Sequence, residues 1–165
     1  MKISLVRLSE GLHTINFVEK LADLGLENHP NLRDEVTVRA DIEKRSPHYF
    51  LKNSVRMSGR FACDRCTDEF DKTVIGEGRA VFSSDEAMLE MSEADDIRYL
   101  ASDVKEIDIT DDIRDTVLLS VPMKNLCSED CRGLCAGCGA NLNTEPCRCA
   151  APAADPRWEA LRKLL

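Results

Sequence analysis

The sequence is poor in aromatic residues, with one Trp, two Tyr and five Phe among 165 residues. A buried core must therefore consist mainly of Val, Ile and Leu, and the length allows one such core, or one core with a smaller lobe. No apolar run approaches the roughly 18 residues of a membrane span, and no apolar stretch of signal length follows the first residues. These absences predict a cytoplasmic protein that does not enter membranes.

Basic residues are also in the minority, because 22 Lys and Arg face 30 Asp and Glu and give a net charge of −8. This balance argues against a broad, sequence-independent grip on nucleic acid, which requires Lys and Arg to neutralise phosphates. It favours a basic protein partner, or RNA contact through a local patch. The acidic run at residues 85–96 is interpreted as a solvated face or a mobile loop, with a docking surface for a basic partner as the alternative.

The residue patterns of common active sites are missing as well. We find no Gly-rich phosphate loop, no Ser/His/Asp set and no paired carboxylates, and the three histidines, His13, His29 and His48, all lie in the first third. The sequence therefore predicts no catalytic residues, no enzymatic activity and no small-molecule substrate.

Alternating apolar and polar residues predict three strands, at residues 36–43, 49–61 and 70–82. Short turns join them, so we expect an antiparallel meander. Gly76 and Gly78 inside the third strand predict a bulge or a kink there. Shorter elements are expected in the first 25 residues and at residues 97–100 and 107–109.

Two helices are expected after the strands. Thr110 is the expected N-cap of the first, whose apolar residues, including Ile113 and Val117, recur at helical spacing until Pro122 ends the helix. The second is expected at the very end of the chain, where Asp155 and Pro156 suit a helix start. The predicted fold class is α+β, with an antiparallel β-sheet, flanking helices and a cysteine-rich, zinc-stapled C-terminal lobe. The expected domains are an α+β core at residues 1–122 and the zinc lobe with its closing helix at residues 123–165.

Cysteine is the residue whose pattern carries most information. Six of the eight cysteines lie between residues 127 and 149 with the spacing C-x3-C-x3-C-x2-C-x8-C-x-C, and the other two form a C-x2-C pair at Cys63 and Cys66. In a reducing compartment, clustered cysteines are metal ligands more often than disulfides. Since no histidine lies near them, they favour a closed, structural zinc site.

The cysteines divide into two candidate ligand sets. The first choice is Cys135, Cys138, Cys147 and Cys149. Its first pair is a C-x2-C followed by glycine, which resembles half of a zinc knuckle, whereas its second pair is closer than usual and requires Pro146 to force a turn. A possible second site, which requires the strand turn and the cysteine segment to touch, consists of Cys63, Cys66, Cys127 and Cys131. In either set, metal binding would stabilise an otherwise irregular segment.

Two other uses of this region are open. The Cys63–Cys66 pair would act as a redox dithiol if one thiol had a lowered pKa, although it lies between strands and Asp64 does not favour a thiolate. The last third of the chain is the least acidic, and basic residues such as Arg132 and Arg148 around the cysteines suit contact with RNA phosphates.

An ordered series of motifs is similar to the YceD family, the bacterial and plastid proteins tied to accumulation of large-subunit ribosomal RNA. The series covers roughly residues 36 to 165 and comprises Cys63-Asp64-Arg65-Cys66, residues 108–123, residues 126–135, residues 138–143 and residues 155–161. The resemblance implies a non-enzymatic factor in large-subunit ribosomal RNA accumulation, processing or early ribosome assembly. Its implied partners are the large-subunit ribosomal RNA precursor, a basic ribosomal protein, or both. From the residues alone, a zinc-stapled interaction adaptor without a ribosomal role and a thiol redox sensor stay open as alternatives.

Overall fold

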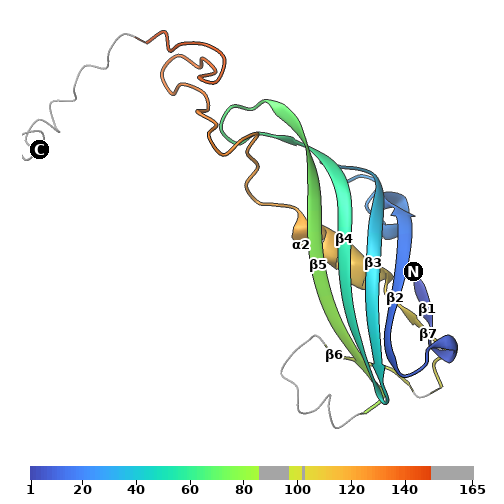
Figure 1. Cartoon of the computed structure of the whole chain (residues 1–165). Coiled ribbons are helices and arrows are strands. Elements are labelled where there is room, and N and C mark those ends of the chain that lie inside the picture. The colour runs from blue at the N-terminus through green and yellow to red at the C-terminus, as the bar shows by residue number, and fades with distance from the viewer. Residues whose placement is uncertain (86–96, 102, 150–165) are drawn as a thin grey trace, which may run out of the picture. The chain divides into compact units, whose positions relative to one another are not determined.

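The computed structural model describes residues 1–85, 97–101 and 103–149 (Figure 1). The chain divides into two compact units. The first consists of Met1–Phe61 and Asp71–Met123, and the second joins Ala62–Phe70 to the segment that begins at Lys124. By its contacts, the turn at residues 62–70 groups with the cysteine-rich segment. The sequence analysis places the same turn in the core domain.

The first unit contains a five-stranded sheet with the strand order β2-β3-β4-β5-β6. The strands are β2 (Gly11–Lys20), β3 (Leu32–Arg45), β4 (His48–Ala62), β5 (Glu69–Ser83) and β6 (Ile97–Tyr99). Pairing is antiparallel from β2 to β4, and the connection from β4 to β5 is too short for a parallel crossover. The predicted antiparallel sheet is confirmed to this extent, but β6 lies parallel to β5 and makes the sheet mixed. A separate pair consists of β1 (Lys2–Ser4) and β7 (Glu106–Asp108).

The described residues contain one α-helix, α2 (Thr110–Ser120), and two 3-10 turns, η1 (Leu5–Arg7) and η2 (Leu21–Leu24). Of the two expected helices, the first is present as α2, so flanking helices are few in this part of the chain. The predicted closing helix lies outside the described residues, as does nearly all of the acidic run, at residues 86–96.

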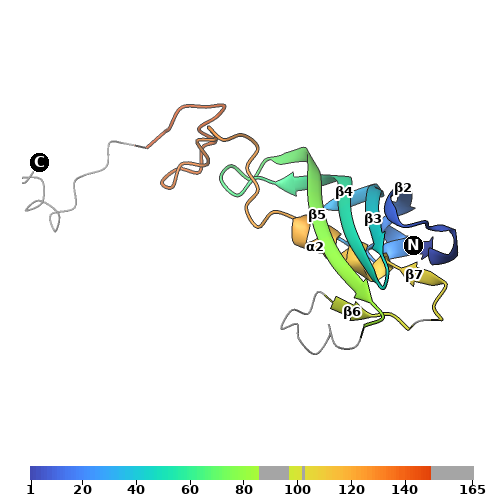
Figure 2. The same ribbon diagram turned by 60° about the horizontal axis from the view of Figure 1, so that its bottom comes forward.

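The core of the first unit lies between one face of the sheet and α2, which crosses that face (Figure 2). Along β3, Val36, Val38 and Ala40 alternate with polar residues and are completely buried. Ile113 and Val117 of α2 are completely buried as well. The alternation along β3 and the helical spacing along α2 thus place apolar side chains on the two faces that meet. Burial of each large apolar side chain contributes about 1.5–3 kcal/mol to the stability of the fold.

Close packing of α2 on β5 explains the two glycines of that strand. A Cβ atom at Gly76 would lie 1.5 Å from Oγ of Ser120, and one at Gly78 would lie 2.2 Å from Oγ1 of Thr116. The sequence analysis assigned these glycines to a bulge or a kink. In the structure they let the backbone of β5 approach the helix where a side chain would keep the two apart.

Thr110 is the first helical residue of α2 rather than its cap, and Asp108 supplies the capping oxygen. The Asp108 carboxylate accepts hydrogen bonds from the Thr110 hydroxyl at 2.6 Å and from the Thr110 backbone N–H at 3.0 Å. Donation by the hydroxyl is the main reason that the pKa of Asp108 lies below its ordinary value. Such a carboxyl group stabilises the folded state above its unfolded pKa, and the contribution disappears as the pH falls through the folded pKa.

We therefore expect Asp108→Ala to lower the free energy of unfolding by about 0.5–1 kcal/mol at neutral pH, the lower part of the capping range, because the carboxylate is half exposed. The deficit should shrink as the pH falls below the unfolded pKa and through the lowered folded pKa of Asp108, because the parent carboxylate then becomes protonated. Urea unfolding at several pH values measures it. Asp103→Ala, which removes an exposed carboxylate away from the helix start, is the control. A deficit that stays constant with pH would contradict the capping role.

Candidate metal centres

The structure brings the eight cysteines together in two groups of four, and within each group all sulfur atoms lie within 4.8 Å of one another. The membership is the same as that of the two sets expected from the sequence. Both groups belong to the second unit. We call them the Cys63 centre (Cys63, Cys66, Cys127 and Cys131) and the Cys135 centre (Cys135, Cys138, Cys147 and Cys149).

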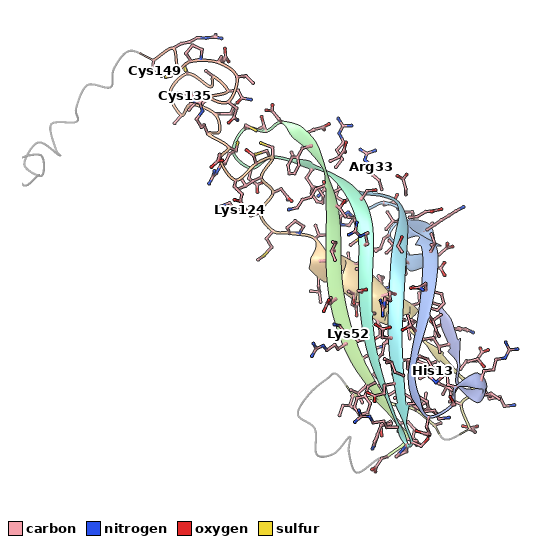
Figure 3. The ribbon with its side chains drawn as sticks, viewed as in Figure 1. His13, Arg33, Lys52, Lys124, Cys135 and Cys149 are labelled. Carbon is pink, nitrogen blue, oxygen red and sulfur yellow. The ribbon has the colours of Figure 1, made fainter. Side chains whose placement is uncertain are left out.

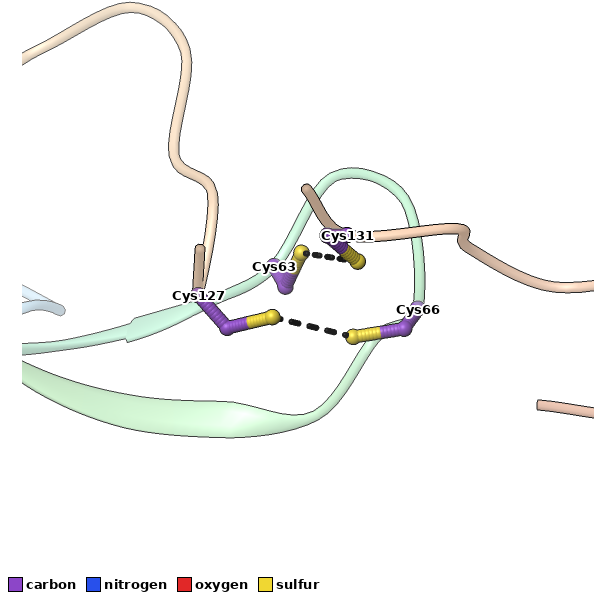
Figure 4. Close-up of side chains that lie close together, drawn as sticks. All are labelled: Cys63, Cys66, Cys127 and Cys131. Carbon is purple, nitrogen blue, oxygen red and sulfur yellow. Dashed lines mark hydrogen bonds between the residues drawn. The ribbon is translucent and has the colours of Figure 1, made fainter. Parts of the chain in front are cut away.

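In the Cys63 centre, a turn of the sheet meets the cysteine-rich segment (Figure 4). The Sγ atoms of Cys63 and Cys131 are 3.8 Å apart, and those of Cys66 and Cys127 are 3.6 Å apart. Four sulfurs bound tetrahedrally to one zinc at about 2.3 Å would lie about 3.8 Å from one another. These two separations are close to those of a tetrahedral four-sulfur site.

Backbone bonds hold the two segments of this centre together. The N–H of Asp64 donates to the carbonyl of Asn125 at 2.8 Å, and the N–H of Asn125 donates to the Asp64 carboxylate at 2.6 Å. The Arg65 guanidinium donates to the carbonyls of Glu129 and Cys131. The two residues inside the C-x2-C turn, which the sequence analysis considered only for their effect on a thiolate, thus attach the turn to the second segment.

The interior of the Cys63 centre is small and mostly made of the ligands themselves. Cys63, Cys66 and Cys131 are at most 3% exposed, and among the described residues Phe70 and Leu126 pack against them as partly buried apolar side chains. A cluster of this size buries too little apolar surface to order its two segments alone. A metal ion bound by the four sulfurs would supply the missing stabilisation.

The Cys135 centre is formed within one segment and lies closer to solvent. Cys135 and Cys149 lie in the same part of the cysteine-rich segment (Figure 3). The Sγ atom of Cys135 is 3.4 Å from that of Cys147 and 3.7 Å from that of Cys149. A Cβ atom at Gly137 would lie 2.5 Å from the Cys149 sulfur, so only glycine permits this approach. Cys147 and Cys149 reach the same centre despite their close spacing in the sequence. Three of the four cysteines are exposed.

The two C-x2-C turns close in the same way. The N–H of Thr67 donates to the carbonyl of Cys63, and the N–H of Gly139 donates to the carbonyl of Cys135, each at 2.8 Å. Both donors have positive φ, 63° at Thr67 and 74° at Gly139. Glycine after a C-x2-C pair is a recognisable signal for this turn, whereas Thr67 hides it, which is why the sequence favoured the Cys135 centre.

Hydrogen-bond donors around the sulfurs favour thiolates, the form that binds metal. Burial raises the pKa of Cys63, but the backbone N–H groups of Cys127, Cys66 and Arg65 outweigh it, and the pKa falls to about 6. At Cys135, the N–H groups of Cys138 and Gly137 lower the pKa to about 6. Each centre therefore holds at least one thiol whose pKa lies below the ordinary cysteine value.

One side chain outside the expected sets also contacts a sulfur. The amide Nδ2 of Asn143 donates to Sγ of Cys131 at 3.3 Å, and its Oδ1 accepts from the N–H of Arg132 at 2.8 Å. Donors of this kind orient metal ligands and adjust their charge. The sequence analysis included Asn143 in a motif but gave it no role, because nothing local shows that it folds back on Cys131.

Within the described residues, none of the three histidines joins either group of cysteines. In the same part of the chain, no helix is long and apolar enough to cross a membrane. Fold and site together define a small α+β protein that carries two four-cysteine centres, each of which could hold a metal ion.

The family model described as "Large ribosomal RNA subunit accumulation protein YceD" matches residues 51–165 of this sequence. The chain belongs to the YceD family, and the resemblance noted from its motifs is confirmed. No solved structure matches it.

Curated relatives include two plant proteins and a bacterial one. The Zea mays "Large ribosomal RNA subunit accumulation protein YCED homolog 1, chloroplastic" is 28% identical over 164 residues, which cover 79% of this chain and 56% of the relative. The Arabidopsis thaliana protein of the same description is 39% identical over 70 residues, 42% of this chain and 22% of the relative. An uncharacterized protein of Mycobacterium tuberculosis is 36% identical over 81 residues, 49% of this chain and 38% of the relative. The chain thus spans little more than half, or less, of each relative.

Proposed function

We propose that this protein is a non-enzymatic factor in the accumulation of large-subunit ribosomal RNA, acting in its processing or in early assembly of the large subunit. The observation that carries this proposal is the family match over residues 51–165, supported by plant relatives whose descriptions name the same process. The proposed partners are the large-subunit ribosomal RNA precursor, a basic ribosomal protein, or both. The proposed location of this chain is the cytoplasm, although two relatives are described as chloroplastic.

The proposal includes one structural zinc in each cysteine centre. Four sulfur ligands at tetrahedral spacing suit zinc in a closed site, because no fourth position is left for a water molecule. Zinc in the Cys63 centre would cross-link the two segments of the second unit, and zinc in the Cys135 centre would stabilise the later segment alone. Residues Arg132 and Arg148, close to the centres in sequence, would then form part of a fixed surface that suits RNA phosphates.

Sedimentation of a cell extract tests the ribosomal role. We expect the epitope-tagged protein to migrate with precursors of the large subunit in a sucrose gradient, and to be absent from mature ribosomes. Depletion of the protein should lower the ratio of large-subunit to small-subunit ribosomal RNA. Migration only as free protein, with an unchanged ratio, would overturn the proposal and favour an interaction adaptor outside the ribosome.

A further inference from the structure

Strand β5 is an edge strand over most of its length. β6 pairs only with Val81–Ser83, and no other described strand lies beside residues 71–79 on that side (Figure 1). The carbonyl of Ser83 accepts a hydrogen bond from the N–H of Leu100 at 2.8 Å, so it points toward this edge. Backbone groups alternate in direction along a strand. Those pointing to the open edge therefore belong to Thr73, Ile75, Glu77 and Arg79.

A cavity of about 440 Å³ opens at the same edge, between β5 and α2. Asn53 of β4 lines it, only 1% of this residue is exposed, and its Oδ1 atom has no hydrogen-bond partner. A buried carbonyl oxygen without a donor costs about 1–3 kcal/mol. Such an atom in a cavity wall is available to accept a hydrogen bond from a donor that enters the cavity.

The helix side of the cavity is acidic and only partly neutralised. Asp112 is bound by both terminal nitrogens of Arg98, at 2.9 and 3.0 Å. Asp115, which also lines the cavity, has a side chain that is 56% exposed, and its nearest cation is Nε of Arg114 at 4.0 Å, the limit of an ion pair. The Asp112 carboxylate is thus paired with Arg98 of β6, whereas the Asp115 carboxylate is open to a further cation.

Arg98 shows how a strand at this edge engages the helix. It is the central residue of β6, and its side chain turns toward α2 to reach Asp112. Asp115 follows Asp112 by one turn of α2, and Leu119 follows by another, with 86% of its surface exposed. A further strand beside residues 73–79 would meet Asp115 and Leu119 as β6 meets Asp112.

We propose that the open edge of β5 binds an extended segment of a basic partner protein, which adds a strand to the sheet and places a Lys or Arg side chain between Asp115 and Asn53. The alternating backbone groups of the edge match another extended chain. Charge complementarity selects the basic side chain on the helix face, and the exposed Ile75, which points to the other face of the sheet, suits an apolar residue next to it in the added strand. Binding at this edge is tested without ribosomes, so a negative result there would leave the ribosomal role untouched, and the reverse also holds.

The test uses the whole protein and a fluorescein-labelled peptide of alternating Lys and Val residues, with fluorescence anisotropy to measure binding. A Glu/Val peptide and a Lys/Val peptide with alternate backbone nitrogens methylated are compared with it. We expect the Lys/Val peptide to bind at least about tenfold more tightly than either, because one comparison peptide reverses the charge and the other cannot pair as a strand. Heteronuclear NMR should show the largest peptide-induced shifts at the amides of Ile75, Glu77 and Arg79.

Matched variants separate this site from general attraction to an acidic protein. Asp115→Asn should weaken binding about tenfold, whereas Asp111→Asn, on the same helix but outside the cavity, should leave it unchanged. Asn53→Leu removes the unpaired oxygen and should weaken binding without lowering the free energy of unfolding. Equal effects of Asp115→Asn and Asp111→Asn, equal binding of the methylated peptide, or shifts away from β5 would each overturn the proposal.

Discussion

Replacing Cys63 with Ser is expected to unfold the Cys63 centre while leaving the first unit folded. The parent chain, purified without oxygen, should contain two zinc ions, and the variant should contain one. Binding of a structural zinc contributes about 10–16 kcal/mol in small zinc domains, which exceeds what the few apolar side chains around this centre can replace. Metal analysis gives the zinc content, and limited digestion with trypsin reports the unfolding through new cleavage after Arg65.

Cys149→Ser is the matched control, because it removes one sulfur of the same type from the other centre. It should also reduce the zinc content to one, yet leave Arg65 protected, since the bonds from Arg65 to Glu129 and Cys131 lie in the Cys63 centre. Parent protein without zinc would overturn the metal assignment. Protection of Arg65 in the Cys63→Ser variant would show that the centre folds without its ligand set.

The second large effect is expected at Gly76, where alanine should destabilise the protein by about 2–3 kcal/mol. In an ordinary strand interior the same change stabilises by about 0.5–1 kcal/mol, because glycine loses more conformational freedom on folding. The sign reverses here because the new Cβ atom would lie 1.5 Å from Oγ and 2.6 Å from Cβ of Ser120, so rotation of the serine side chain cannot relieve the clash. Thermal or urea unfolding measures the difference.

Two further variants check this reason. Thr73→Ala, at an exposed position of the same strand, should change the free energy of unfolding by less than about 0.5 kcal/mol. Ser120→Gly removes both clashing atoms. In a protein that already carries Ser120→Gly, the change Gly76→Ala should therefore lower the free energy of unfolding much less than it does in the parent. Additive effects of the two changes would argue against direct contact between β5 and α2.

The sequence predicted the long strands well and the edges of the sheet poorly. Alternation at residues 36–43 and 49–61 reflects burial on one face, so it marks β3 and β4 directly, although both extend beyond the predicted bounds. The parallel pairing of β6 with β5 leaves no such signal, because it depends on where the intervening chain returns. The contact that explains Gly76 is with a helix residue far along the chain, and local patterns cannot show it.

Among the cysteines, the grouping into two sets followed from spacing, since each contains a C-x2-C pair and needs two more sulfurs. The spacing of the cysteines does not show which of the two groups is more buried. Sequence analysis ranked the Cys135 centre first because glycine marks its turn. The structure buries the Cys63 centre instead, where Thr67 adopts the positive φ and Asn143 returns to Cys131.

The Cys63 centre takes its ligands from two segments separated by Asp71–Met123 of the first unit, and this sets an order of events during synthesis. Cys63 and Cys66 leave the ribosome before α2 and well before Cys127 and Cys131. The pair is therefore an incomplete ligand set until the later segment has been made. Closure of this centre then reports that the chain has been translated through Cys131, and it joins the early and late parts of the protein in one step.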